Sequence, residues 1–161
     1  MPNTPALVLA GISGLYAMPE VSAAEKQQAA DMLRNVGEIA WLPSEDDIDA
    51  VTAVSGSGPA YVFYFIEALQ AAAQAQGLDA ATARALTLHT FAGAAKLAME
   101  SAEPAAELRR RVTSKGGTTE KALEQLQALG VHAAIGTAVA AATQRSRELG
   151  TQFGAGTAPK T

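Results

Sequence analysis

The chain has 161 residues with 12 basic and 16 acidic side chains, a formal charge of −4 and no cysteine. The length suggests one domain, or one domain plus a fragment. The charge gives no basic surface for nucleic acid, and the missing cysteines exclude disulfides, thiolate catalysis and Cys-ligated zinc. We expect no membrane partner, because no apolar run approaches the length of a bilayer span. We expect no signal peptide, because the first residues have no basic region and no long apolar core. We also expect a cytoplasmic location.

The N-terminal part of the chain predicts a strand, a helix and a second strand. Residues 7–17 are apolar and interrupted by glycines, which favours extended structure. Ser22 with Glu25 three residues later forms a capping box that opens a helix, and Gly37 ends it. Residues 38–42 indicate a short strand. Two strands and one helix cannot complete a stable sheet alone, because the sheet edges stay unpaired.

From residue 44 onward the hydrophobic pattern is helical. The expected helices cover residues 46–54, 59–76, 80–101, 104–111, 118–129 and 131–149. Residues 61–66 are apolar on every side of their helix, and each such side chain gains about 1.5–3 kcal/mol when it is fully buried. A small domain can hardly cover this segment, so we expect a partner chain. Residues 150–161 are rich in glycine, threonine and proline and predict a disordered tail.

The segment 112–119, Val-Thr-Ser-Lys-Gly-Gly-Thr-Thr, has the composition of an anion-binding loop. Gly116 and Gly117 permit backbone turns that a Cβ atom would forbid. The helix that follows begins with unpaired N–H groups at the positive end of its dipole. Hydroxyl groups are supplied by Ser114, Thr118 and Thr119. The loop fits a carboxylate or phosphate pocket, and it equally fits a capped turn between two helices.

Four blocks in order resemble the C-terminal part of pyrroline-5-carboxylate reductase. These blocks are residues 1–6, 53–61, 93–96 and 108–126. The resemblance extends from residue 1 to about 149, and two departures accompany it. No Gly-x-Gly-x-x-Gly follows a strand in this chain, and Lys115 stands where the family usually has proline.

The resemblance implies a mainly α fold. Residues 1–42 would be the remnant of a Rossmann-type cofactor domain, residues 43–149 an all-helical dimerisation and substrate-binding domain, and residues 150–161 a disordered tail. The implied partner is a second copy of the chain, in an intertwined homodimer or a larger homo-oligomer.

The resemblance also implies the reaction, which is reduction of the C=N bond of 1-pyrroline-5-carboxylate to L-proline with NADPH or NADH. The N–H groups of Gly116, Gly117 and Thr118, helped by Ser114, would hold the substrate carboxylate. The hydroxyl of Thr119 would face the imine nitrogen as a hydrogen-bond donor that orients or relays a proton. If the substrate binds as an iminium ion, hydride transfer needs no acid.

Other residues would lie beside the nicotinamide of the cofactor. By the same resemblance these are Asn3, Thr4, Ser55, Gly56, Ser57, Gly58 and Pro59. A helix cap explains Ser57 and Pro59 equally well. Because the phosphate-binding loop is absent from this sequence, we expect the chain alone to be inactive, and we expect no metal.

Two alternatives stay open. The chain could be a helical oligomerisation or scaffold module without catalytic activity. It could also be a fragment of a related imine or hydroxy-acid reductase.

Overall fold

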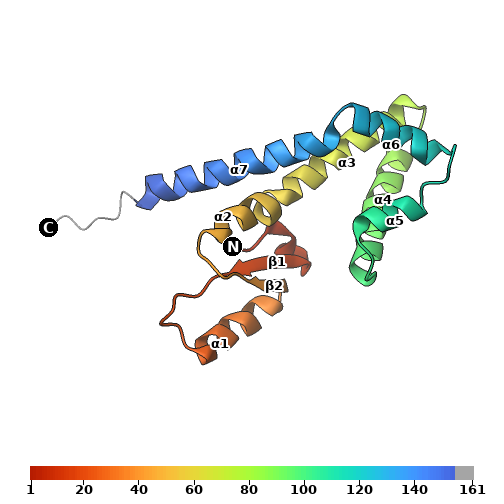
Figure 1. The fold of residues 1–161 in the computed structure, drawn as a ribbon. Helices are drawn as coiled ribbons and strands as arrows, with labels where there is room; N and C mark the ends of the chain where they lie inside the picture. Colours follow the sequence, from red (N-terminus) through yellow and green to blue (C-terminus); the bar gives the residue numbers. More distant parts are fainter. Residues whose placement is uncertain (155–161) are drawn as a thin grey trace. The chain divides into compact units, whose positions relative to one another are not determined.

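A computed structural model describes residues 1–154 (Figure 1). Their backbone contacts divide the chain into two compact units. The first unit contains Met1–Tyr61 together with the chain from Ile135 onward, and the second unit contains Val62–Ala134. Each unit is described by itself.

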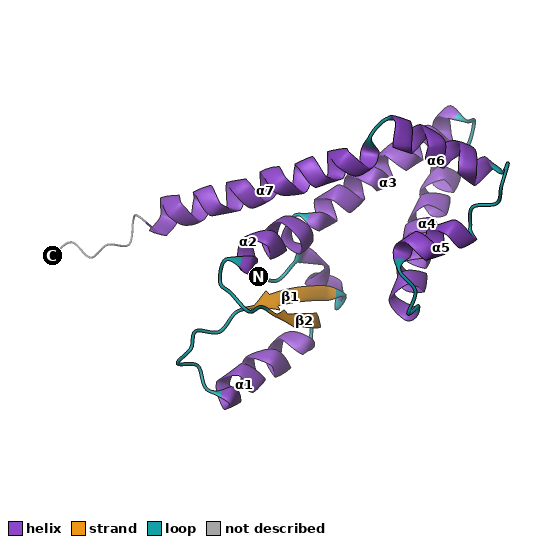
Figure 2. Ribbon diagram, viewed as in Figure 1, coloured by secondary structure: helices purple, strands orange, loops and turns teal. Residues whose placement is uncertain are grey.

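The first unit contains a small parallel sheet (Figure 2). Its elements are η1 (Thr4–Val8), β1 (Gly11–Leu15), α1 (Ala23–Arg34), β2 (Gly37–Trp41), α2 (Asp47–Val51) and η2 (Thr52–Gly56). The strands pair in a register that runs from Gly11 opposite Gly37 to Leu15 opposite Trp41. Helix α1 packs on β2 and helix α2 packs on β1, so the sheet positions both helices.

Two glycines allow the close approaches in this unit. Gly37 has φ +149°, and a Cβ atom there would lie 2.0 Å from the carbonyl oxygen of Gly11. A Cβ atom on Gly14 would lie 2.7 Å from Cγ1 of Val51 on α2. Side chains at these two positions would therefore separate the strands or lift α2 from the sheet.

The predicted capping box is present at the start of α1. The Ser22 hydroxyl accepts a hydrogen bond from the Glu25 N–H at 3.3 Å, and the Ser22 N–H donates to the Glu25 carboxylate at 2.9 Å. These two bonds satisfy N–H groups that a helix start leaves unpaired, so α1 begins where the sequence predicts.

Two local predictions for this unit were wrong. Residues 7 and 8 belong to the 3₁₀ helix η1 and are not extended, because the Asn3 carbonyl accepts from the Ala6 N–H and closes a tight turn. The helix after residue 46 does not end at residue 54 but continues as the π-helical segment η2. There the Ser57 N–H donates to the Thr52 carbonyl five residues earlier, at 2.8 Å.

The rest of the chain is helical. Its helices are α3 (Gly58–Ala75), α4 (Ala80–Glu100), α5 (Ala105–Arg111), α6 (Thr118–Ala128) and α7 (Val131–Gly154). Both α3 and α7 pass from one unit into the other.

The last helix corrects the tail prediction at residues 150–154, which are helical. A glycine inside a helix costs only about 1 kcal/mol relative to alanine, so Gly150 does not end α7. Beyond it, the Thr151 hydroxyl donates to the Arg147 carbonyl at 3.0 Å. The remaining tail residues, 155–161, lie outside the described residues.

The described residues bury very little. The buried apolar residues are Ala30, Ala53 and Ala83, and no large side chain among residues 1–154 is fully buried. On α3, Phe63 is 65% exposed and Tyr64 is 70% exposed. The mainly α fold preceded by a parallel strand pair is confirmed, and the apolar segment on α3 is largely exposed among residues 1–154.

Candidate functional site

The anion-loop candidate joins α5 to α6 in the second unit. Gly116 has φ +74°, in the left-handed region that favours glycine. Gly117 is extended, with φ −81° and ψ 171°, and stands at the N-cap of α6. A Cβ atom on Gly117 would lie 2.5 Å from the Ser114 hydroxyl oxygen. The glycine pair therefore shapes the turn and leaves room for the Ser114 side chain.

The backbone N–H groups predicted to hold a carboxylate differ in their partners. The Gly116 N–H donates to the carboxylate of Glu120 at 2.7 Å, and the Gly117 N–H donates to the Ser114 carbonyl at 3.0 Å. The N–H groups of Thr118 and Thr119 donate no hydrogen bond within residues 1–154. They are the unpaired donors that the first turn of a helix leaves over.

The hydroxyl groups of the loop are available to a ligand. Those of Ser114, Thr118 and Thr119 make no hydrogen bond to any part of the chain that the structure describes. Ser114 and Thr118 are exposed, whereas Thr119 is half-buried. Lys115 is exposed and forms no ion pair with the described residues.

Sequence reasoning missed Glu120. A glutamate at the third position of a helix commonly reaches back to the N–H groups before it, and that spacing was the available signal. Here the Glu120 carboxylate reaches the Gly116 N–H. The contact shows that this N–H group can hold a carboxylate, and it places a negative charge beside the predicted substrate position.

The predicted nicotinamide-side residues lie in the first unit. The Asn3 side-chain oxygen accepts from the Ile12 N–H at 2.9 Å, and the Ser55 hydroxyl donates to the Val51 carbonyl at 3.0 Å. A Cβ atom on Gly56 would lie 2.6 Å from the Met1 methyl group. Met1 thus lies against the end of η2, and this contact brings the segment with Asn3 and exposed Thr4 to the segment with Ser55 and Gly56.

The remaining residues of this set are at a helix start. Gly58 and Pro59 are the first two residues of α3, and the Ser57 carbonyl accepts from the Ala60 N–H at 3.0 Å. The Ser57 side chain forms no hydrogen bond with the described residues. The backbone at Ser57, Gly58 and Pro59 therefore has the conformation of a helix start, which is the alternative considered above for Ser57 and Pro59.

An apolar hollow of about 310 Å³ lies between the sheet and the segment containing α2 and η2. It is lined by Ile12, Gly14, Ala40, Ala50, Val51, Val54 and Ser55. Ser55 is its one predicted site residue, and none of the lining residues is charged. The hollow could take a flat, weakly polar ring but offers no partner for a phosphate.

Asp49, on α2, forms contacts with α7. The Asp49 carboxylate accepts from the Ser146 hydroxyl at 2.5 Å and lies 3.8 Å from the Arg147 guanidinium on α7.

Within residues 1–154, no group of three or more histidine, aspartate or glutamate side chains is arranged to hold a metal ion. No single helix there is long and apolar enough to cross a membrane; α6 and α7 meet that requirement only as a bent pair.

Comparison with known proteins identifies the family. Residues 45–149 match the family model described as pyrroline-5-carboxylate reductase dimerisation. The chain belongs to the pyrroline-5-carboxylate reductase family. The resemblance of the sequence blocks to the C-terminal portion of these enzymes is therefore confirmed.

Relatives match nearly the whole chain but only part of their own length. A pyrroline-5-carboxylate reductase of Pseudomonas aeruginosa is 54% identical over 154 residues, which are 96% of this chain and 56% of that protein. Pyrroline-5-carboxylate reductase 2 of Bacillus subtilis is 42% identical over 95% of this chain and 55% of its own length. The chain spans about half the length of the curated relatives it matches.

Solved structures of the family share the fold. A pyrroline-5-carboxylate reductase from Coxiella burnetii aligns with a TM-score of 0.90 and 45% identity over 92% of this chain and 55% of its own. The Plasmodium falciparum pyrroline carboxylate reductase, whose crystal structure has NADP bound, aligns with a TM-score of 0.85 and 34% identity over 93% of this chain and 61% of its own.

Proposed function

We propose that the chain is the dimerisation and substrate-binding part of a reductase that converts 1-pyrroline-5-carboxylate to L-proline with NADPH or NADH. The observation that carries this proposal is the start of α6. Its Thr118 and Thr119 N–H groups and hydroxyls have no partner within the described residues, in a chain whose family reduces this substrate. The same domain would pair two copies of the chain.

The loop would bind the substrate through its carboxylate. The Thr118 N–H is unpartnered, and the Gly117 N–H can add a second, shared hydrogen bond to an anion at the positive end of the α6 dipole. The Gly116 N–H would join them when the Glu120 side chain moves aside. The exposed Ser114 hydroxyl adds a directed donor.

Thr119 would act at the imine nitrogen. Thr119 is half-buried, and its hydroxyl makes no hydrogen bond within residues 1–154. The hydroxyl can therefore donate to the ring nitrogen of a substrate whose carboxylate is bound at the neighbouring Thr118. A threonine hydroxyl is a weak acid at neutral pH, so its role is to orient or relay a proton. Binding the carboxylate and the adjacent ring nitrogen together orients the carbon of the C=N bond that receives hydride.

A nicotinamide cofactor supplies the hydride when it is bound. Of the residues proposed beside it, Asn3, Thr4 and Ser55 to Pro59, only Ser55 lines the apolar hollow of about 310 Å³. That hollow suits the nicotinamide end of the cofactor and not its diphosphate. Because no Gly-x-Gly-x-x-Gly follows a strand in this sequence, we propose that this chain alone does not bind the diphosphate and does not turn over substrate.

The domain arrangement belongs to the same proposal. Residues 1–42 would complete a cofactor domain of the Rossmann type and residues 43–149 would form the dimer. A cytoplasmic location would suit such a biosynthetic enzyme.

Binding of the product to the isolated chain tests the loop assignment. In an NMR titration with L-proline, the amide signals of Gly116, Gly117 and Thr118 should shift together and give one dissociation constant. Pyrrolidine, which lacks the carboxylate, is the matched control and should leave these signals in place. Equal shifts with both compounds, or none with L-proline, would contradict the carboxylate site. Micromolar binding of NADPH by calorimetry would contradict the assignment of its diphosphate elsewhere.

A further inference from the structure

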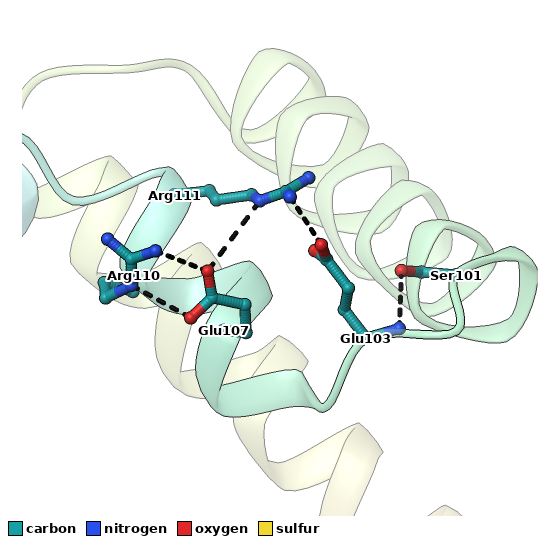
Figure 3. Close-up of polar contacts among 5 residues, drawn as sticks. All are labelled: Ser101, Glu103, Glu107, Arg110 and Arg111. Atoms are coloured by element: carbon teal, nitrogen blue, oxygen red, sulfur yellow. Dashed lines mark hydrogen bonds and ion pairs between the residues drawn. The ribbon is translucent and has the colours of Figure 1, made fainter.

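The last turn of α5 is tied to the segment that precedes this helix (Figure 3). The Arg111 guanidinium donates to the Glu103 carboxylate and lies 4.0 Å from the Glu107 carboxylate. Arg110 donates to both oxygens of Glu107, at 2.9 and 2.5 Å. The Glu103 N–H donates to the Ser101 hydroxyl at 3.0 Å, so the segment between α4 and α5 is itself held in place.

The same turn leads directly into the anion-binding loop. The Thr113 N–H donates to the Arg110 carbonyl at 3.1 Å, and the Thr113 hydroxyl donates to the Arg109 carbonyl at 2.6 Å. One residue later comes Ser114, whose carbonyl accepts from the Gly117 N–H. The last turn of α5 is therefore bonded to Glu103 through Arg111 and to Thr113 through the carbonyls of Arg109 and Arg110, and the glycine pair follows three residues later.

Glu103 depends on Arg111 for its charge partner. One carboxylate oxygen of Glu103 is shielded from solvent and has no hydrogen-bond partner, and the whole side chain is only 33% exposed. A shielded carboxylate without a nearby cation is costly, so loss of Arg111 would favour displacement of Glu103 into water. The segment between α4 and α5 would then lose its hold on the end of α5.

Other ion pairs near the loop differ in kind. The pair of Lys121 with Glu124 joins positions three residues apart on the surface of α6. It cannot fix one segment relative to another, and exposed pairs of this sort contribute little to stability. Glu107 has a similar local partner in Arg110, whose hydrogen bonds lower the pKa of the Glu107 carboxyl. The pair of Glu103 and Arg111 spans eight residues and joins two segments.

We propose that Glu103 and Arg111 are positioning residues that hold the start of the 112–119 loop, so that the Gly117 and Thr118 N–H groups point to the substrate carboxylate. Their role in substrate binding rests on the proposed function, whereas their restraint of the 112–119 loop does not depend on it. Neither side chain touches the substrate.

Two measurements on the full chain test this role. Glu103→Gln and Arg111→Gln should each speed amide hydrogen exchange at Gly116 and Gly117, measured by NMR, by about fivefold. They should weaken L-proline binding by a similar factor. Glu124→Gln, which breaks the local pair on α6, is the matched control and should change neither value. In the double variant Glu103→Gln with Arg111→Gln the two effects should not add, because either change alone breaks the same pair.

The exchange and binding measurements test the positioning role and the carboxylate site separately. If the unchanged chain does not bind L-proline, the carboxylate site fails, while the exchange rates still test the hold on the loop. Unchanged exchange in both single variants would overturn the positioning role. A double variant whose effect equals the sum of the two single effects would overturn it as well, including when the single variants lose helix content by circular dichroism.

Discussion

At the start of α6, the Glu120 side chain accepts a hydrogen bond from an N–H group that we propose to bind the substrate. The Glu120 carboxylate accepts from the Gly116 N–H at 2.7 Å, while the Thr118 N–H stays unpartnered within residues 1–154. A substrate carboxylate at Thr118 would therefore approach a negative charge. Glu120 would then lower the affinity for anions as long as it stays in place.

Replacing Glu120 with Gln should raise the affinity of the chain for L-proline. Two unit charges about 4 Å apart in water repel by about 1 kcal/mol, which corresponds to roughly a fivefold change in dissociation constant. Glutamine keeps the hydrogen-bond acceptor for the Gly116 N–H and removes only the charge. Calorimetric titration with L-proline measures the change, and Glu124→Gln, also on α6, controls for the loss of a surface charge. An unchanged or weaker affinity would show that Glu120 does not oppose the substrate.

At the scale of elements, local signals predicted most helix and strand positions. The capping box of Ser22 and Glu25 predicted the start of α1, because it rests on contacts within a few residues. The start of α6 at the glycine pair was predicted for the same reason. The contact of Glu120 with Gly116 depends on a side-chain conformation, and η2 depends on one inserted residue; neither follows from hydrophobic periodicity.

The strand pair should not tolerate a side chain at Gly37. A Cβ atom would lie 2.0 Å from the backbone of Gly11, so Gly37→Ala should lower the free energy of unfolding by about 3 kcal/mol or more. Gly58→Ala is the matched control, because no atom lies within 4 Å of its Cβ position and the residue belongs to a helix. Urea unfolding followed by circular dichroism measures both. Equal stability of the two variants would contradict the observed strand contact.

The cap of α4 should lose its effect in acid. The Asp79 carboxylate accepts from the Thr82 hydroxyl at 2.6 Å and from the N–H groups of Thr82 and Ala81. The Thr82 hydroxyl, followed by these N–H groups, lowers the pKa of Asp79 below the ordinary value of 3.8. A lowered pKa stabilises the fold above the unfolded-state pKa, and this contribution is lost as pH falls through the folded-state value.

Asp79→Ala should therefore unfold at lower urea than the unchanged chain at pH 7, and the two midpoints should converge below about pH 3.8. Asp79→Asn, which keeps an acceptor, should remain close to the unchanged chain at pH 7. A difference between Asp79→Ala and the unchanged chain that persists undiminished at pH 3 would argue against the ionised cap.

At the scale of the whole molecule, large apolar side chains stay exposed among the described residues. They include the aromatic residues Phe63 and Tyr64 on α3. The sequence predicted an uncovered apolar helix because residues 61–66 leave no polar face, but a single chain cannot show which surface covers it.

We expect the chain to be a dimer at micromolar concentration, or a larger homo-oligomer, with a mass by light scattering of at least twice 16.5 kDa. Phe63→Glu should shift the mass toward that of a monomer, because a charge at a buried contact is costly. Gln28→Glu, at an exposed position on α1, is the control and should leave the mass unchanged. A monomeric unchanged chain would contradict a dimer built on α3.

The formation of L-proline by a completed enzyme tests the central claim most directly. The chain would be joined to the part of the Pseudomonas aeruginosa reductase that it does not match; over the matched 154 residues the two proteins are 54% identical. With NADPH and 1-pyrroline-5-carboxylate, this chimera should form L-proline. Thr119→Ala should lower turnover by about a hundredfold or more, and Thr119→Ser, which keeps the hydroxyl, should retain most of it. A folded, dimeric chimera without activity, or equal turnover with Thr119→Ala, would contradict the assignment of the loop as the substrate site.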